Sequence, residues 1–319
     1  MKEKKLKDAE KLLQKHQYDK AIKIYEELHK TYPEEESILL MLAWAYYDSG
    51  AAQKAIECLS ILFERELQRG IFTGFAFDEL VRIYKKEKNF CKLVEICEKA
   101  IIAQPEDIGL LVELGNSYLQ LGKAKEACST YEKLIKMEDD NPVFYCLWGE
   151  ALFAAGLFHE SEEVYMRAVK IDPDQAADYC FKLAALFQQA GNHKEAERLV
   201  DQCIALRPEN SLFYCSRGDT LIGLGQIKEA LESYEKAIQY GGHNSAGAYC
   251  NRLGNALLKA KYFSQAATAF KEAIKHDNIQ PSYFGLISAY RAMGLEDQAD
   301  KIMCEIEKSG KVNKFSQTY

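Results

Sequence analysis

The sequence predicts an all-α protein, a solenoid of about nine helix hairpins that fills residues 2–308. The first observation is a unit of about 34 residues that recurs along the chain and carries a small residue near the start of its second helix. These markers stand at Ala21, Ala55, Leu93, Ala127, Ser161, Ala196, Ala230, Ala266 and Ala299. The second observation is that all six prolines fall at unit boundaries, because proline inside a helix costs about 3 kcal/mol. A fixed period of this length is typical of solenoids, whose units bury their apolar faces against their neighbours.

The fourth unit shows why each unit should form two helices. Leu111, Leu114 and Tyr118 recur at helical spacing and form one apolar stripe. Gly122 then ends this helix, because glycine tolerates the left-handed conformation found at helix ends. A second stripe follows Gly122 and predicts the second helix. We expect Gly115 to be small because the paired helix crosses the first helix there.

The other units repeat this pattern, with starts near residues 2, 36, 74, 108, 142, 177, 211, 247 and 280. The small crossing residue recurs at Ala9, Ala43, Gly149, Ala184, Gly218 and Gly254. The turn glycine recurs at Gly50, Gly156, Gly191, Gly225 and Gly294, whereas the first unit has His16 in this place. A large residue fills the second helix at Tyr25, Tyr165, Tyr234 and Phe270. Residues 309–319 are expected to form a short polar tail.

Two joints between units depart from the regular spacing. The chain reads ELQRGIFTG between the second and third units, and YGGHNSAG between the seventh and eighth. Two interpretations stay open at each joint, a hinge or a simple variation in loop length.

These features resemble the tetratricopeptide repeat family, and they are best kept in VFYCLWGEALFAAGLFHESEEVYMRAVKIDPD and FYCSRGDTLIGLGQIKEALESYEKAI. The resemblance implies a right-handed superhelix in which first helices line a concave groove. It also implies a role in protein binding. One subtype of the family grips a terminal carboxylate with Lys, Asn and Arg from successive units. That set is not found here, because Asn116 and Asn255 occupy its slots singly.

The resemblance assigns the groove-facing slots of the first helices. As a protein-binding surface we predict Leu40, Trp44, Tyr47, Arg82, Lys85, Asn116, Leu119, Cys146, Phe153, Phe181, Asn251, Arg252, Asn255 and Phe284. The same slots also hold Val112, Leu147, Cys215, Asp219, Ile222 and Leu258. One interpretation is a groove for a partner peptide or helix, with Trp44, Phe153 and Phe181 as anchors. The other is that these side chains pack against each other.

Composition excludes several classes of function. The net charge of -7 argues against sequence-independent nucleic-acid binding, which needs excess Lys and Arg. The basic cluster from Arg82 to Lys92 is interpreted as a solvated face or as a patch for an acidic partner. No apolar run approaches the length of a membrane span, so we expect no membrane insertion. The opening residues contain no apolar run of signal-peptide length, so we expect a cytoplasmic protein.

The ten cysteines form no C-x-x-C pair and are spread along the repeats. This spacing favours buried free thiols in a reducing compartment. A metal or redox role is the alternative, with Cys146, Cys180, Cys215 and Cys250 as its best candidates. The chain has no H-E-x-x-H, G-x-S-x-G or P-loop motif. We therefore expect no catalytic residue, no cofactor and no metal.

The last unit lacks the further polar helix that usually closes such a solenoid. Leu295, Ile302, Met303 and Ile306 are therefore predicted to form an apolar end that supports a homodimer or docks a partner. The sequence as a whole predicts a non-catalytic scaffold that binds a partner protein in its concave groove. The alternatives are a self-associating assembly protein, or a regulatory repeat subunit of an enzyme whose catalytic chain is separate.

Overall fold

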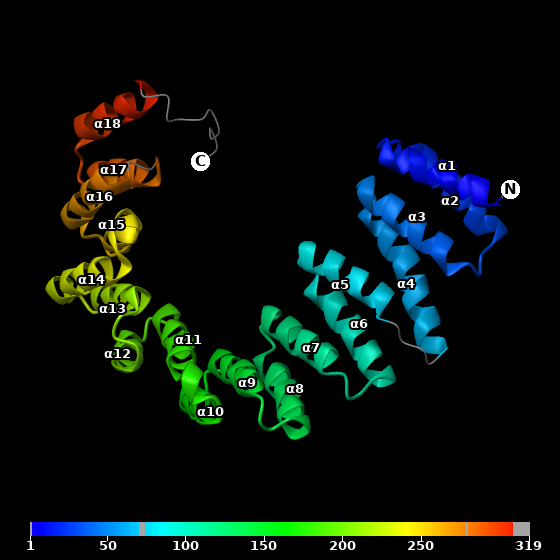
Figure 1. Ribbon diagram of the computed structural model, residues 1–319, viewed down its shortest axis with the longest axis horizontal. Coiled ribbons are helices and arrows are strands. Elements are labelled where there is room, and N and C mark those ends of the chain that lie inside the picture. Colours follow the sequence, from blue (N-terminus) through cyan, green and yellow to red (C-terminus); the bar gives the residue numbers. More distant parts are fainter. Residues whose placement is uncertain (1, 70–73, 278–279, 309–319) are drawn as a thin grey trace. The chain divides into compact units, whose positions relative to one another are not determined.

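The computed structural model is an all-α helical repeat in the residues it describes, 2–69, 74–277 and 280–308 (Figure 1). These residues form eighteen α-helices and one short 3-10 turn, and no strand. The helices alternate along the chain, so that odd-numbered helices are the first helices of the repeats and even-numbered helices are the second helices. The chain divides into two compact units, Met1–Phe158 and His159–Tyr319, which we call unit 1 and unit 2.

Unit 1 contains the first nine helices, and α1 to α9 pack in sequence order. They are α1 (Lys2–Gln14), α2 (Tyr18–Thr31), α3 (Glu36–Asp48), α4 (Ala52–Gln68), α5 (Phe75–Lys86), α6 (Phe90–Ala103), α7 (Ile108–Gln120), α8 (Ala124–Met137) and α9 (Pro142–Ala154).

Unit 2 contains the remaining helices, and α11 to α18 again pack in sequence order. They are α10 (Phe158–Ile171), η1 (Pro173–Gln175), α11 (Ala176–Gln189), α12 (His193–Leu206), α13 (Ser211–Gly223), α14 (Ile227–Gly241), α15 (His243–Lys259), α16 (Phe263–Asp277), α17 (Gln280–Ala292) and α18 (Glu296–Lys308). Within this unit, α15 also contacts the first helices on either side, α13 and α17. The prediction that both units form one solenoid over residues 2–308 stays a prediction.

In several repeats the crossing of the helix pair is built around a buried ring. Tyr131 of α8 is fully buried, and a Cβ atom placed on Gly115 of α7 would lie 2.4 Å from the Tyr131 ring. Gly218 and Tyr234 repeat this arrangement in unit 2, with a corresponding distance of 2.5 Å. The predicted reason for small residues at the crossing is thereby confirmed.

The turns inside the hairpins share one backbone conformation. Gly50, Gly122, Gly156, Gly191, Gly225 and Gly294 all have positive φ. His16, Lys88 and Lys261 hold the same place with φ of 56°, 54° and 66°, so side chains stand where the other repeats use glycine. The turn is closed by a hydrogen bond from an N–H to the carbonyl five residues earlier, 2.9 Å at Gln17 and 2.8 Å at Asn89. This hydrogen bond helps to offset the cost of about 1–2 kcal/mol for a left-handed residue that is not glycine.

Helix boundaries follow the sequence closely, with one exception. The prolines lie at helix starts or between helices, as predicted, and Pro142 opens α9 behind the capping side chain of Asn141. The exception is α15, which begins at His243, whereas the sequence analysis placed its unit near residue 247. Gly242, with φ of 74°, alone separates it from α14, so the joint YGGHNSAG is mostly helix. In the joint ELQRGIFTG, α4 extends to Gln68, and residues 70–73 lie outside the described residues.

The last described helix turns its apolar stripe inward. Ile306 of α18 is 2% exposed, and Ile302 and Met303 pack against the core of unit 2. Leu295, in the turn before α18, is 38% exposed. Of the four residues that we expected at an apolar end, Ile306 is therefore buried and Ile302 and Met303 are half-buried, because α18 packs on α17. The predicted tail, 309–319, lies outside the described residues.

A single methyl group tests the crossing. We expect Gly115→Ala to lower the free energy of unfolding by roughly 1–3 kcal/mol, because the fully buried ring of Tyr131 has no free space to move into. Chemical denaturation measures this change. Gly109→Ala in the same helix is the matched control, because its new Cβ would meet nothing closer than the Asp107 side chain at 3.2 Å. Equal stability of the two variants would contradict the packing argument.

Candidate functional site

The first helices of unit 2 enclose a hollow of about 690 Å³. Three successive first helices, α11, α13 and α15, supply most of its lining, and α12 adds its first residue. The side chains and backbone that line it belong to Gln188, Gln189, Gly191, His193, Asp219, Ile222, Gly223, Arg252, Asn255, Ala256, Lys259 and Ala260. We call this cavity the unit 2 hollow. Its volume is large enough to hold part of a ligand.

An ion pair on one wall of the hollow joins two helices. The Arg252 guanidinium donates to Asp219 Oδ2 from Nε at 2.9 Å and from Nη2 at 2.6 Å. The hydroxyl group of Tyr234 donates to the other carboxylate oxygen, Oδ1. Burial, followed by the charge of Asp219, raises the pKa of Tyr234 and keeps it a neutral donor. Both carboxylate oxygens of Asp219 therefore already accept hydrogen bonds, whereas Arg252 keeps Nη1 for another acceptor.

Amide side chains form a second part of the wall. Asn255 Nδ2 donates to Asn251 Oδ1 at 2.7 Å, and Asn251 Nδ2 donates to Ser282 Oγ of α17 at 2.9 Å. Gln188 Nε2 donates to Thr220 Oγ1 at 3.2 Å. These bonds fix the amide groups and leave the side-chain oxygens of Gln188 and Asn255 able to accept from a ligand.

Two of the predicted binding residues of unit 2 meet in the hollow, and three do not. Arg252 and Asn255 line it. Asn251 is 9% exposed and does not line the hollow, but its side-chain oxygen accepts a hydrogen bond from Asn255. Phe181 packs against Phe213 with ring centroids 5.0 Å apart, and Phe284 is exposed on α17.

The sequence analysis missed Gln188, His193 and Lys259 among the residues that line the hollow. A signal for Gln188 was present, because it precedes Ile222 by one 34-residue period and therefore shares its slot. His193 lies at the start of a second helix, and no groove slot was assigned there.

Unit 1 places aromatic rings and cations together on its first helices. Trp44 of α3 and Phe75 of α5 form an edge-to-face pair with centroids 6.1 Å apart. One helical turn further along α3, the Tyr47 ring lies under the Arg82 guanidinium at 4.5 Å and the Lys86 ammonium group at 5.2 Å. We call Trp44, Tyr47, Phe75, Arg82 and Lys86 the aromatic–cation patch. Trp44, Tyr47 and Arg82 were predicted for the binding surface, Lys86 was noted only as part of the basic cluster, and Phe75 was missed.

The other predicted residues of unit 1 have internal roles. Asn116 Oδ1 accepts a hydrogen bond from the Tyr131 hydroxyl at 2.9 Å, so its oxygen is used by the repeat itself. Cys146 is 3% exposed, and its burial leaves it out of reach of a ligand on the surface. Lys85 forms an ion pair with Glu113 at 2.6 Å. Leu40, Leu119 and Phe153 are half-buried.

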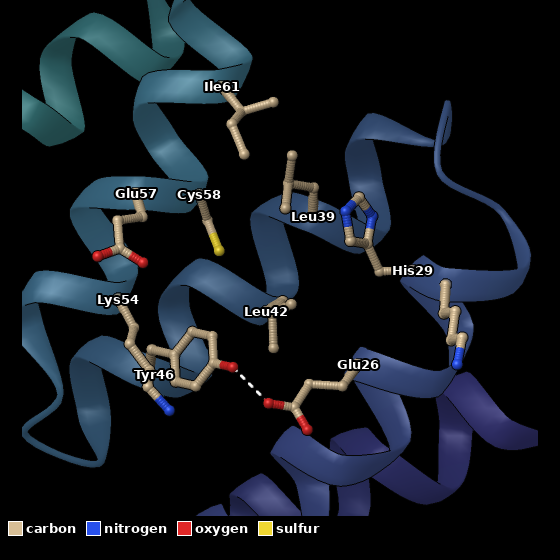
Figure 2. A pocket seen from close by; sticks show the side chains of 10 residues that line it. Glu26, His29, Leu39, Leu42, Tyr46, Lys54, Glu57, Cys58 and Ile61 are labelled. Atoms are coloured by element: carbon tan, nitrogen blue, oxygen red, sulfur yellow. Dashed lines mark hydrogen bonds between the residues drawn. The ribbon is translucent and has the colours of Figure 1, made fainter.

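A second hollow, of about 490 Å³, lies in unit 1 and is lined by residues of α2, α3 and α4 (Figure 2). Leu39 and Leu42 of α3 are among its lining residues, and the Tyr46 hydroxyl donates to Glu26 Oε1 at 2.5 Å. The same contact recurs two repeats later, between Tyr118 and Glu98 at 2.6 Å. We therefore assign this feature to the packing of a second helix against the first helix of the next repeat.

The cysteines behave as packing residues in the structure. Eight of them are buried and two, Cys91 and Cys304, are exposed. Burial raises the pKa of Cys97, Cys203 and Cys215 to about 12.

No cluster of three or more His, Cys, Asp or Glu side chains suited to a metal is found in the described part of the chain. Every helix among the described residues is also too short or too polar to cross a lipid bilayer.

Three family models of the tetratricopeptide repeat match the chain. One matches residues 12–69, a second matches residues 112–176, and a third matches residues 177–210 and 212–240. Together these matches cover more than half of the chain. They fall on helix pairs of both units.

Curated relatives and solved structures share the repeat at low identity. Mouse protein O-mannosyl-transferase TMTC3 is 25% identical over 219 residues, which is 66% of this chain and 22% of that protein. Human protein O-mannosyl-transferase TMTC1 is 23% identical over 185 residues, or 57% of this chain and 20% of that protein. The chain thus spans about a fifth of these relatives. A tetratricopeptide repeat protein from Parabacteroides merdae has a TM-score of 0.52 at 18% identity, covering 80% of this chain and 98% of that one, which supports the fold.

Thiol reactivity tests the interpretation of the cysteines. We expect Cys91 and Cys304 to react quickly with a disulfide reagent at about pH 8, and the eight buried thiols to react after unfolding. The physical reason is that burial limits access and, at the most buried positions, raises the thiol pKa and removes the reactive thiolate. A colorimetric thiol count with and without guanidinium measures both groups. More than two fast thiols in the folded protein would contradict this assignment.

Proposed function

Because the chain belongs to the tetratricopeptide repeat family, we propose that it is a non-catalytic scaffold that holds a segment of a partner protein on its first-helix face. The unit 2 hollow is the observation that supports this proposal best. Its wall presents the remaining Arg252 donor, the ammonium group of Lys259, and the amide oxygens of Gln188 and Asn255. Lys259 has no hydrogen-bond or ion-pair partner among the described residues.

This mixture of donors and acceptors suits a polypeptide segment. A peptide backbone offers an N–H and a C=O at nearly every residue, so both kinds of group on the wall can be satisfied. Each such hydrogen bond contributes about 0.5–1.5 kcal/mol net, and association costs at least about 4 kcal/mol. The hydrogen bonds therefore supply orientation, and apolar contacts along the rest of the face supply most of the affinity. A micromolar complex is the expected result.

The arrangement of charges supports a binding role over a catalytic one. The carboxylate of Asp219 is held by Arg252 and Tyr234, and it is therefore a poor acceptor for a proton from a substrate. The match to O-mannosyl-transferases covers about a fifth of those proteins, so their activity does not carry over to this chain.

We further propose a cytoplasmic location. The eight buried cysteines are unpaired thiols spread over both units. Free thiols in this number are typical of a reducing compartment, because an oxidising one favours disulfides.

Filling the unit 2 hollow tests the binding site. We expect Asn255→Trp to reduce partner capture by about tenfold or more, because the indole occupies the space and covers the Lys259 and Gln188 groups. Asn255 is exposed, so the variant should fold. The measurement is affinity purification of the full chain from cells of its source, with quantitative mass spectrometry of the captured proteins.

Glu235→Trp is the matched control for this experiment. Glu235 is exposed on the second helix α14 of the same unit. Its replacement by tryptophan adds the same indole at a position outside the hollow. Capture that is lost in Asn255→Trp and kept in Glu235→Trp supports the proposal. An identical set of proteins captured by both variants, or none captured by the unaltered chain, overturns it.

A further inference from the structure

We propose that the aromatic–cation patch of unit 1 binds an acidic segment of a partner, one that carries Asp or Glu beside an aromatic or branched aliphatic side chain. This inference rests on the proposed function in one respect, the use of the first-helix face for binding. It adds the chemistry of the partner and a location in unit 1. The argument depends on three observations about the patch: its exposed rings, its ordered cations and its charge.

The first observation is the exposure of two large rings that contact each other. Trp44 is 39% exposed and Phe75 is 45% exposed, and their centroids are 6.1 Å apart. Single exposed apolar side chains are common on protein surfaces, whereas adjoining aromatic rings form a surface that a partner can cover. Tryptophan is among the residues that contribute most to binding energy, because it buries a large area with few rotatable bonds. An apolar side chain of the partner is the matching group.

The second observation is that the neighbouring cations are ordered before any ligand arrives. The Tyr47 ring holds Arg82 at 4.5 Å and Lys86 at 5.2 Å, and Lys86 Nζ also donates to the Tyr47 hydroxyl at 3.0 Å. Glu79 of the same helix accepts from Arg82 at 2.6 Å. Long cationic side chains lose rotamer entropy when a ligand immobilises them, and these contacts have already removed part of that freedom.

The third observation is the unpaired charge of the patch. Lys86 has no carboxylate partner among the described residues. Other members of the same basic cluster do, because Arg82 pairs with Glu79, Lys85 with Glu113 and Lys92 with Glu95. Within the patch, Lys86 is therefore the cation whose charge no carboxylate of the described residues balances, and it lies against the Tyr47 ring. On a chain of net charge -7, this local positive charge favours an acidic ligand.

Selection from a random library of dodecapeptides displayed on phage tests the proposal with the full chain as the target. We expect the selected peptides to be enriched in Asp and Glu next to Trp, Phe, Leu or Ile. Synthetic copies of these peptides, followed by fluorescence anisotropy, should bind about tenfold more weakly to Trp44→Ala and to Lys86→Glu. Their binding should also weaken as salt rises, because exposed charges are screened.

Two matched controls separate the patch from general effects. Lys92→Glu reverses a charge of the same basic cluster on α6, where Glu95 is the partner. Ile61→Ala removes an apolar side chain of similar exposure, 45%, on α4. We expect both variants to bind the selected peptides as the unaltered chain does. Circular dichroism of each variant verifies that its helices are intact.

The outcomes distinguish this inference from the proposed function. Acidic, apolar peptides that lose affinity in Trp44→Ala and Lys86→Glu, and keep it in the controls, support the acidic-partner surface. Peptides that are neutral or basic, or that bind Lys86→Glu as well as the unaltered chain, overturn it. Peptides that lose affinity in Asn255→Trp alone also overturn it while leaving the scaffold function of the first-helix face in place. A library that yields no binder overturns the inference as well.

Discussion

The structure depends on a fit between one small residue and one large ring at the helix crossings of several repeats. In the fourth repeat the glycine is Gly115 and the ring belongs to Tyr131, and in the seventh repeat Gly218 and Tyr234 take these roles. Glycine inside a helix costs about 1 kcal/mol relative to alanine. Complete burial of a large side chain contributes roughly 1.5–3 kcal/mol, so the pair is favourable as a whole. Because burial of the ring outweighs the cost of the glycine, the small residue and the aromatic residue recur with the same period.

This fit also determines what the first helices can show to a ligand. The buried Tyr131 and Tyr234 rings extend under the first helix until their hydroxyl groups reach Asn116 and Asp219. Both acceptors belong to slots that the sequence analysis assigned to the binding face. Their oxygens are already engaged by the repeat, and Asp219 in turn orders Arg252. The groups left for a ligand are therefore those around these acceptors, such as Lys259 and the Gln188 oxygen.

The periodic features could be predicted from the sequence, and the local ones could not. Helix pairs, turns and buried rings follow from the repeat, because each position meets an equivalent neighbour in the next unit. Exposure of a given groove residue depends on the particular side chains around it. Cys146 and Asn251 were expected on the binding face and are buried. Ile306 was expected to be exposed and is covered by its own repeat. The early start of α15 was missed because the pair Gly241–Gly242 indicates a loop, and here it separates two helices by one residue.

The hydrogen bond from Tyr234 to Asp219 joins the interior of a repeat to its outer wall. Replacement of Asp219 by a residue without an acceptor oxygen would leave a buried hydroxyl without its acceptor and would release the arginine that α15 supplies. Divergence of this protein toward new ligands should therefore proceed through the unengaged positions, where a change costs the repeat little. Among duplicated copies of such a chain, we would expect the tyrosine–aspartate pair to persist while Gln188 and Lys259 vary. The architecture thus separates positions that can change without loss of stability from positions that the fold requires.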